Sequence, residues 1–211
     1  MRPCPAKAMS NQFLATNGIT ELPPGRIACV VTFMQNPGPP PAPPAPPAGL
    51  TLETQSPVEV AAYRALYRRV GENFLWLSRL LMPEAELAGW LGLPTTEIQF
   101  ARRGSVPIGL IELDRSAAGD TEIVSFGVVP EEIGSGASHF MMQALLGEEF
   151  ARGARRVWLH TCTFDHPAAI PFYRQHGFRA YKFAVEIAED PRLNGLLPKE
   201  AAPQVPLLDG S

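Results

Sequence analysis

The proline-rich stretch NPGPPPAPPAPPAG, residues 36–49, constrains the fold of this chain more than any other segment. Proline fixes φ and has no amide hydrogen, so this run favours an extended polyproline II conformation and joins neither a helix nor a sheet. It therefore separates an N-terminal arm, residues 1–35, from the remainder of the chain. Within the arm, RIACVVTFMQ (26–35) is apolar and rich in β-branched residues, which predicts one strand. The run is interpreted as a stiff spacer, with docking into an aromatic groove of a partner as the alternative.

The composition of the whole chain narrows its class. The 211 residues are 45% hydrophobic and 18% charged, as in ordinary globular proteins. The net charge of −3 argues against nucleic acid as a partner. No apolar stretch reaches the about 20 residues that span a bilayer, and the N-terminus lacks the apolar core of a secretory signal, so no membrane partner is expected. The three widely spaced cysteines, Cys4, Cys29 and Cys162, predict neither a disulfide framework nor a metal site and favour a reducing, cytoplasmic location.

The pattern of apolar residues after the spacer predicts one domain over residues 50–190, followed by a C-terminal tail, residues 191–211. Expected strands lie at 50–55, 97–104, 106–114, 121–130, 155–164 and 178–187, and expected helices at 57–71, 83–92, 135–152 and 167–176. Their order is β-α-α-β-β-β-α-β-α-β. This order predicts an α/β protein with a mixed, mostly antiparallel sheet flanked by helices and a strand–helix–strand crossover near its end.

A glycine-rich turn, IGSGAS (133–138), lies where an expected strand ends and an expected helix begins. The first amide groups of a helix have no intrahelical partner, and the helix dipole is positive there. Gly134 and Gly136 carry no Cβ that would keep a phosphate away from the backbone, and Ser135 and Ser138 add hydroxyl donors. On these residues alone, the segment is either a plain tight turn or a phosphate cradle.

The second half of the chain resembles a known family. The segment EIVSFGVVPEEIGSGAS, the later ALLGEEFARGARRVWLHTCTFDHP and the closing AAIPFYRQHGF (168–178) are similar to the GNAT superfamily of acetyl-coenzyme-A-dependent N-acetyltransferases. The closing segment matches the family's Ala-x-x-Phe-Tyr-x-x-x-Gly-Phe signature, and EIVSFGVV corresponds to its β-bulged strand. The resemblance covers about residues 50–188 and is most specific over 120–178. It implies a GNAT-like fold, with acetyl-coenzyme A as co-substrate.

The resemblance also implies where the cofactor binds. The backbone N–H of Phe126 would hold the thioester carbonyl, with Val128 on the same strand and His166 beside the pantetheine arm. The diphosphate loop would comprise Ile133, Gly134, Ser135, Gly136, Ala137 and Ser138. The sequence departs from the family at three of these positions: Ile133 replaces Gln or Arg, Ser138 replaces Gly or Ala, and His166 replaces Asn. These departures motivate an alternative function, a catalytically degenerate domain that binds acyl-coenzyme A as a sensor.

Candidate catalytic residues follow from the same resemblance. Tyr173 would be the general acid at the leaving sulfur. Glu122, four residues before Phe126, is the first candidate for the base, with a pKa that desolvation is expected to raise. Glu112 on the neighbouring strand is the rival and could instead bind a cationic substrate, and His160 is a third candidate.

The expected function is acetyl transfer from acetyl-coenzyme A to a primary amine, by direct attack in a ternary complex. A small-molecule amine is favoured over a protein because the sequence shows no acidic or basic groove. Trp76, in ENFLWLSRLL, either lines the acceptor pocket or packs in the core. Pairing of the last strands of two copies, giving a homodimer, is a further hypothesis.

Overall fold

The computed structural model describes residues 17–39 and 45–208. The centre of the proline run, residues 40–44, and the first 16 residues of the expected arm lie outside this part of the chain. The strands are β1 (Arg26–Asn36), β2 (Leu50–Thr54), β3 (Thr96–Arg103), β4 (Val106–Asp114), β5 (Asp120–Val128), β6 (Arg156–Cys162) and β7 (Arg179–Glu189). The helices are α1 (Val60–Gly71), α2 (Ser78–Leu81), α3 (Glu84–Leu91), α4 (Ala137–Ala151) and α5 (Ala169–Gln175).

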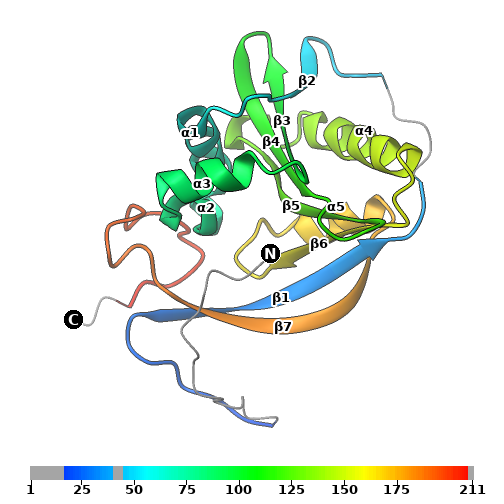
Figure 1. The fold of residues 1–211 in the computed structure, drawn as a ribbon. Helices are drawn as coiled ribbons and strands as arrows, with labels where there is room; N and C mark the ends of the chain where they lie inside the picture. The colour runs from blue at the N-terminus through cyan, green and yellow to red at the C-terminus, as the bar shows by residue number, and fades with distance from the viewer. Residues whose placement is uncertain (1–16, 40–44, 209–211) are drawn as a thin grey trace.

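The strands form one seven-stranded sheet in the order β2-β3-β4-β5-β6-β1-β7 (Figure 1). Every neighbouring pair is antiparallel except β5 and β6, which are parallel and are joined through α4. The predicted mixed, mostly antiparallel sheet flanked by helices is therefore confirmed. The short helix α2 was not predicted.

The strand that precedes the proline run lies inside the sheet. β1 pairs with β6 on one side and with β7 on the other, with Val31 opposite both Cys162 and Ala184. This part of the expected N-terminal arm is thus a structural member of the domain that follows the spacer. Such pairing joins residues more than a hundred positions apart, which local sequence patterns do not report.

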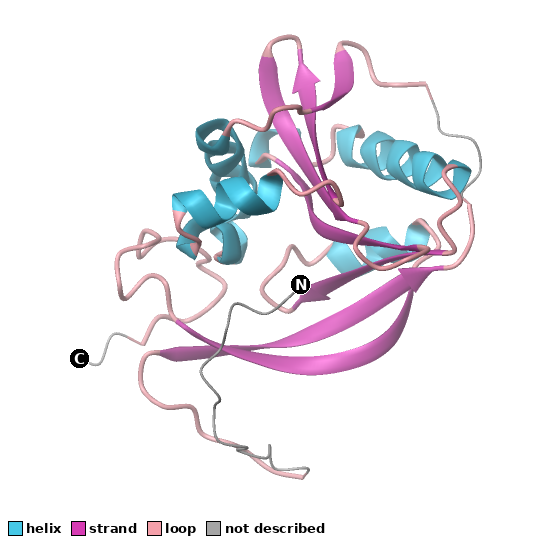
Figure 2. Cartoon of the chain, viewed as in Figure 1, coloured by secondary structure: helices cyan, strands magenta, loops and turns pink. Residues whose placement is uncertain are grey.

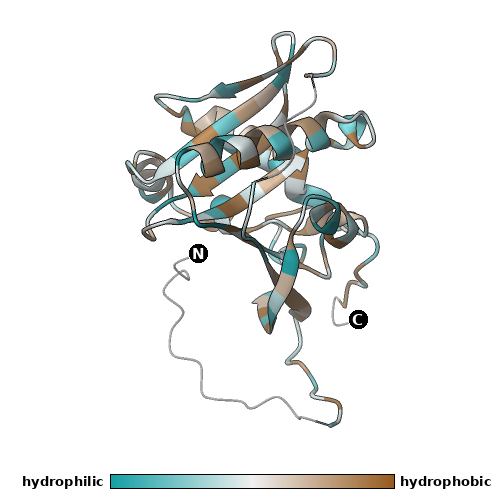
Figure 3. Ribbon diagram, turned by 90° about the vertical axis from the view of Figure 1, so that its right-hand side faces the viewer, coloured by the Kyte–Doolittle hydropathy of each residue, from teal (hydrophilic) through white to brown (hydrophobic). Residues whose placement is uncertain are grey.

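Helices cover both faces of the sheet, with α1, α2 and α3 on one face and α4 and α5 on the other (Figure 2). Helix α1 buries Tyr63, Leu66, Tyr67 and Val70, which follow the spacing of one helical face. Figure 3 colours the strands and helices by hydropathy, and both carry hydrophobic and hydrophilic residues. In the central strand β4, residues 108–113 are all buried, because both faces of the sheet are covered. Among residues 17–39 and 45–208, no helix is both long enough and apolar enough to cross a bilayer.

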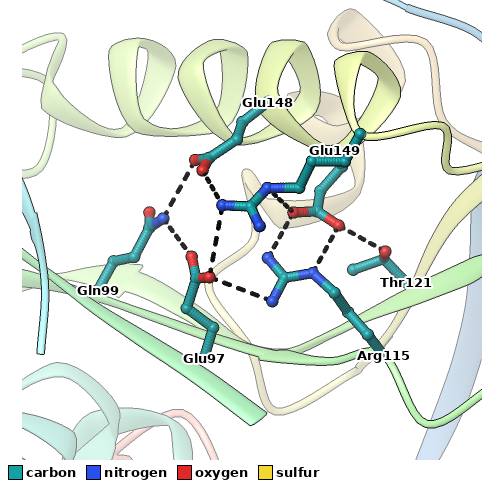
Figure 4. Close-up of polar contacts among 7 residues, drawn as sticks. Glu97, Gln99, Arg115, Thr121, Glu148 and Glu149 are labelled. Atoms are coloured by element: carbon teal, nitrogen blue, oxygen red, sulfur yellow. Dashed lines mark hydrogen bonds and ion pairs between the residues drawn. The ribbon is translucent and has the colours of Figure 1, made fainter. Parts of the chain in front are cut away.

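A network of charged side chains fixes α4 to the sheet (Figure 4). Arg115, at the end of β4, donates to both carboxylate oxygens of Glu149 on α4, at 2.5 and 2.9 Å. Thr121 of β5 donates to the same carboxylate at 2.6 Å, and Arg115 also reaches Glu97 of β3 at 3.2 Å. Glu149 is almost completely buried. The network joins three strands to the helix whose N-terminus forms part of the site described below.

Two irregularities open the sheet beside α4. Glu112 lies opposite Ser125 but Leu113 lies opposite Ile123, so Val124 is an extra residue in β5. The β-bulge predicted in EIVSFGVV is therefore confirmed. Pairing between β5 and β6 covers only Asp120 to Ile123, and the described strands part beyond that point.

Candidate active site

The glycine turn before α4 has the backbone shape that the sequence suggested. Gly134 and Gly136 have φ values of +84° and +85°, in the left-handed region that favours glycine. A Cβ at either position would meet no atom within 4 Å, so the space above the turn is open. Within the turn, the Ser135 hydroxyl accepts the Ala137 N–H at 3.2 Å.

The first turn of α4 adds unpaired amide groups to this cradle. The first backbone bond of the helix runs from Phe140 N–H to the Gly136 carbonyl at 3.1 Å. The amides of Ser138 and His139 precede it and have no intrahelical acceptor. Glu132, whose negative charge would oppose an anion here, is held by Arg103 through two hydrogen bonds of 2.8 Å. Arg103, together with Ser135, lowers the pKa of Glu132 to about 2.

A cavity of about 560 Å³ begins at this cradle and continues into the split between β5 and β6. Eight of the predicted site residues line it: Phe126, Val128, Ile133, Gly134, Gly136, Ser138, His166 and Tyr173. The remaining four, Glu112, Glu122, Ser135 and Ala137, are not among the residues that line it. Its far end reaches β1 and β7 at Cys29 and Glu186. One cavity is therefore lined both by the glycine turn and by His160 and Tyr173.

Tyr173 lies on α5 with its ring packed between Phe172 and Phe178. Burial and the nearby Asp165 carboxylate raise the pKa of Tyr173 above its usual range. The phenol therefore stays protonated at neutral pH and can donate a proton into the cavity. Tyr173 lines the cavity although Pro171, which cannot donate a backbone hydrogen bond, lies two residues before it in the same helix.

Asp165 is the centre of a polar junction that sequence reasoning missed. Its carboxylate accepts hydrogen bonds from Trp76 Nε1 at 3.0 Å, from the Thr161 hydroxyl at 2.7 Å and from the Cys162 amide at 2.9 Å. Trp76 therefore lines the cavity, which was one of its two predicted positions, and its hydrogen bond to Asp165 joins it to the loop after β6. Gly127 leaves room for this packing, since a Cβ there would lie 2.6 Å from Val70. A carboxylate directly after a strand, in TFDHP, is the only sequence signal for this junction.

Glu122 and His160 meet across β5 and β6. Glu122 Oε1 lies 3.6 Å from His160 Nδ1, and His160 lines the cavity while Glu122 does not. Burial acts to raise the pKa of Glu122, but its contact with His160 and its further polar contacts lower it overall. The expected raised pKa is therefore wrong: Glu122 is a carboxylate at neutral pH. The two candidates are therefore in contact, and only His160 lines the cavity.

Glu112 belongs to the scaffold instead of the cleft. Its fully buried carboxylate accepts hydrogen bonds from Tyr63 at 2.5 Å, Trp90 Nε1 at 2.8 Å and Ser125 at 3.2 Å. Arg79 of α2 forms an ion pair with it at 2.5 Å. The structure therefore does not bring Glu112 together with Tyr173 and His160 in the cavity, as the base or cation-binding hypothesis requires. The carboxylate ties α1, α2 and α3 to the bulged strand, since the oxygens are satisfied by buried donors.

The remaining departures from the family pattern leave the cavity open. His166 Nδ1 accepts the Ala168 amide at 3.1 Å, and its ring lies edge-on to Phe74. Ile133 lines the cavity with an apolar side chain that offers no hydrogen bond. The pairing of β1 with β6 also brings Cys29 and Cys162, both free thiols, to one wall. Within the part of the chain that the structure describes, no group of three His, Cys, Asp or Glu residues could hold a metal ion.

Several solved structures share this fold at low sequence identity. A GCN5-related N-acetyltransferase from Sphaerobacter thermophilus is 22% identical, with a TM-score of 0.60, over 77% of this chain and 52% of that chain. A tandem GNAT protein from the clavulanic acid biosynthesis pathway is 16% identical, with a TM-score of 0.58, over 76% and 53%. An aminoglycoside acetyltransferase from an uncultured soil metagenomic sample, in complex with sisomicin, is 15% identical, with a TM-score of 0.51, over 61% and 87%.

The chain spans about half the length of the first two of these structures. No curated protein matches the sequence. The family model of the acetyltransferase (GNAT) family, however, matches residues 54–178, which include β3 to β6, the glycine turn and Tyr173. This match covers more than half of the chain. The chain therefore belongs to the GNAT acetyltransferase family.

Proposed function

We propose that this protein transfers an acetyl group from acetyl-coenzyme A to a primary amine of a small molecule, by direct attack in a ternary complex. The observation that carries the proposal is the single cavity that joins the glycine cradle at α4 to Tyr173 and His160. A cofactor site without a route to proton-transfer groups would suit binding alone. Here both parts open into one space.

The cradle residues fit a diphosphate. The amides of Ser138 and His139, with those turn amides that are not bonded within the loop, would bind it, because glycine at 134 and 136 leaves the backbone accessible. Phe126 and Val128 would line the path of the pantetheine arm beside the bulge. Acetyl-coenzyme A, when bound, supplies an activated thioester.

The remaining chemistry belongs to the chain's own side chains. The Glu122 carboxylate beside Nδ1 favours a proton on that nitrogen, which leaves Nε2 of His160 as the basic atom that accepts a proton from the amine. Glu122 is then a positioning residue behind the base. The Tyr173 hydroxyl, kept protonated by its burial, is the proton donor for the leaving group. Such proton transfers contribute about 10²–10⁴-fold each.

The far end of the cavity suggests the acceptor. Its walls are mostly apolar, from Ile27, Leu75 and Phe164, with the Glu186 carboxylate of β7 among them. An exposed carboxylate at the rim of a mostly apolar cavity favours a compact acceptor that carries a cationic amine. This supports a small molecule over a protein side chain.

The direct test is release of free thiol from acetyl-coenzyme A in the presence of a panel of primary amines. Mixtures that lack the amine give the background from hydrolysis and from the protein's own thiols. Amine-dependent release, with acetylated amine found by mass spectrometry, supports the enzyme. Binding of acetyl-coenzyme A with no turnover on any amine supports the alternative, an acyl-coenzyme A sensor.

A further inference from the structure

Strand β7 leaves one edge of the sheet uncovered. Among the described residues it pairs only with β1, so the amide and carbonyl groups along its other edge have no strand partner. Apolar side chains on this strand are exposed: Phe183 by 69% and Val185 by 43%. Val30 of β1 adds another exposed side chain on the same sheet. A long apolar edge strand is a template for pairing with another strand.

The sequence of β7, RAYKFAVEIAE, is complementary to itself when read antiparallel about Ala184. In that register Lys182 lies opposite Glu186 of a second copy, and Phe183 lies opposite Val185. Arg179 lies opposite Glu189, and all eleven residues are matched. Because the arrangement is two-fold symmetric, each of these contacts occurs twice.

Neighbouring registers lose this match. A two-fold axis at Phe183 places Lys182 opposite Ala184, and an axis at Val185 places Glu186 opposite Ala184. The central contacts carry more weight than the ends, for two reasons. The register with β1 shifts beside Phe33, so β7 is irregular near Tyr181. Glu189 is already paired with Arg26 at 3.0 Å.

We propose that two copies of this chain associate through antiparallel pairing of their β7 strands, with the two-fold axis at Ala184. The pairing continues the sheet of one copy into that of the other and covers the exposed edge. Opposite charges and apolar pairs directly across an antiparallel ladder stabilise such a contact.

The proposed pairing also completes the acceptor end of the cavity. Side chains directly opposite in an antiparallel pair share a face of the sheet. Glu186 lines the cavity, so Lys182 of the partner subunit would lie at the rim of that cavity and would share the two oxygens of the Glu186 carboxylate with a cationic acceptor. The Lys182 Nζ lies 3.8 Å from the centre of the Phe33 ring, and none of the described carboxylates forms an ion pair with it.

The first test is sedimentation equilibrium of the full chain and of charge variants. The native protein is expected at twice the chain mass of 22.9 kDa. Lys182→Glu and Glu186→Lys each place like charges across the axis and should weaken the dimer by about tenfold or more. The double variant restores opposite charges and should recover the native affinity. A monomeric native protein, or a dimer that neither single variant weakens, would overturn the proposal.

The second test fixes the register by cross-linking in a background of C4A, C29A and C162A. Ala184→Cys brings the two cysteines to a Cα separation of about 5 Å, which suits a disulfide. Ala188→Cys, on the same face, places them about 26 Å apart. Diamide, which takes up the two electrons and two protons, should give covalent dimer with Ala184→Cys and none with Ala188→Cys. Equal cross-linking of both variants, or none with Ala184→Cys, would contradict the register.

Discussion

Glu122 Oε1 lies 3.6 Å from His160 Nδ1, just where β5 and β6 part. The contact places an ionised carboxylate behind an imidazole that faces the cavity. If Glu122 acts only through His160, replacing Glu122 has no further effect in a variant that already lacks the imidazole.

We therefore expect His160→Ala to lower kcat by about 10²-fold, and Glu122→Gln to lower it less. The double variant should be no slower than His160→Ala alone, because the two residues form one unit. Steady-state kinetics on the four proteins measures this. Effects that multiply in the double variant would mean that the two residues act separately.

Tyr173→Phe removes the proposed proton donor and keeps the ring that packs against Phe172 and Phe178. We expect kcat to fall by about 10²-fold, with the affinity for coenzyme A within about twofold of the native value. Phe172→Leu, which alters the same cluster without touching the hydroxyl, is the control for packing. Unchanged turnover in Tyr173→Phe would remove the residue from the mechanism.

Gly136→Asp places a side chain and a negative charge in the open cradle before α4. Gly153→Asp is a matched control, because Gly153 also has positive φ and open surroundings but follows the other end of α4. Both variants carry the backbone cost of about 1–2 kcal/mol in stability. Only Gly136→Asp should weaken coenzyme A binding, by about tenfold or more. Equal affinities of the two variants would refute the assignment of the cradle.

The buried Glu149 predicts how stability depends on pH. Burial acts to raise the pKa of Glu149, but Arg115 and Thr121 lower it overall from its ordinary value of 4.5. A carboxylate whose pKa is lower in the folded protein stabilises the fold at pH values above its ordinary pKa. This stabilisation is lost as the pH falls through the pKa of the folded state. Glu149→Gln should therefore cost about 3 kcal/mol in unfolding free energy at pH 7, and less below pH 4.

The control for this prediction is Glu148→Gln on the same helix. Glu148 pairs with Arg152 on the exposed side, and its replacement should cost less than about 0.5 kcal/mol. Urea unfolding at several pH values measures both variants. A cost for Glu149→Gln that stays constant from pH 7 to pH 3 would contradict the assignment.

Local signals in the sequence were enough for most of the fold. Alternation and helical spacing located the strands and the main helices, whereas the bulge at Val124 was predicted from the resemblance of EIVSFGVV to the family's bulged strand. The glycine turn was recognisable because its conformation depends on Gly134 and Gly136 themselves. Tyr173 was located by its motif, and the structure places it on the cavity wall.

Long-range packing decided what the sequence could not predict. β1 enters the sheet between β6 and β7, although the proline run follows it directly. Glu112 and Glu122 looked alike as carboxylates on neighbouring strands. Their surroundings separate them, since Arg79 from the unpredicted α2 holds Glu112 in the core while Glu122 meets His160. The surroundings of a buried carboxylate depend on how three helices pack, which no local pattern contains.

In the proposed function, amides between Gly134 and Ser138 bind the diphosphate of coenzyme A and so direct a thioester into the split between β5 and β6. Titration calorimetry of the folded full chain with coenzyme A and with acetyl-coenzyme A tests it most directly. We expect one site per chain for each ligand, with binding lost in Gly136→Asp and kept in Gly153→Asp. The absence of any binding heat with either ligand, on protein that is folded by circular dichroism, would rule out the proposed coenzyme A site.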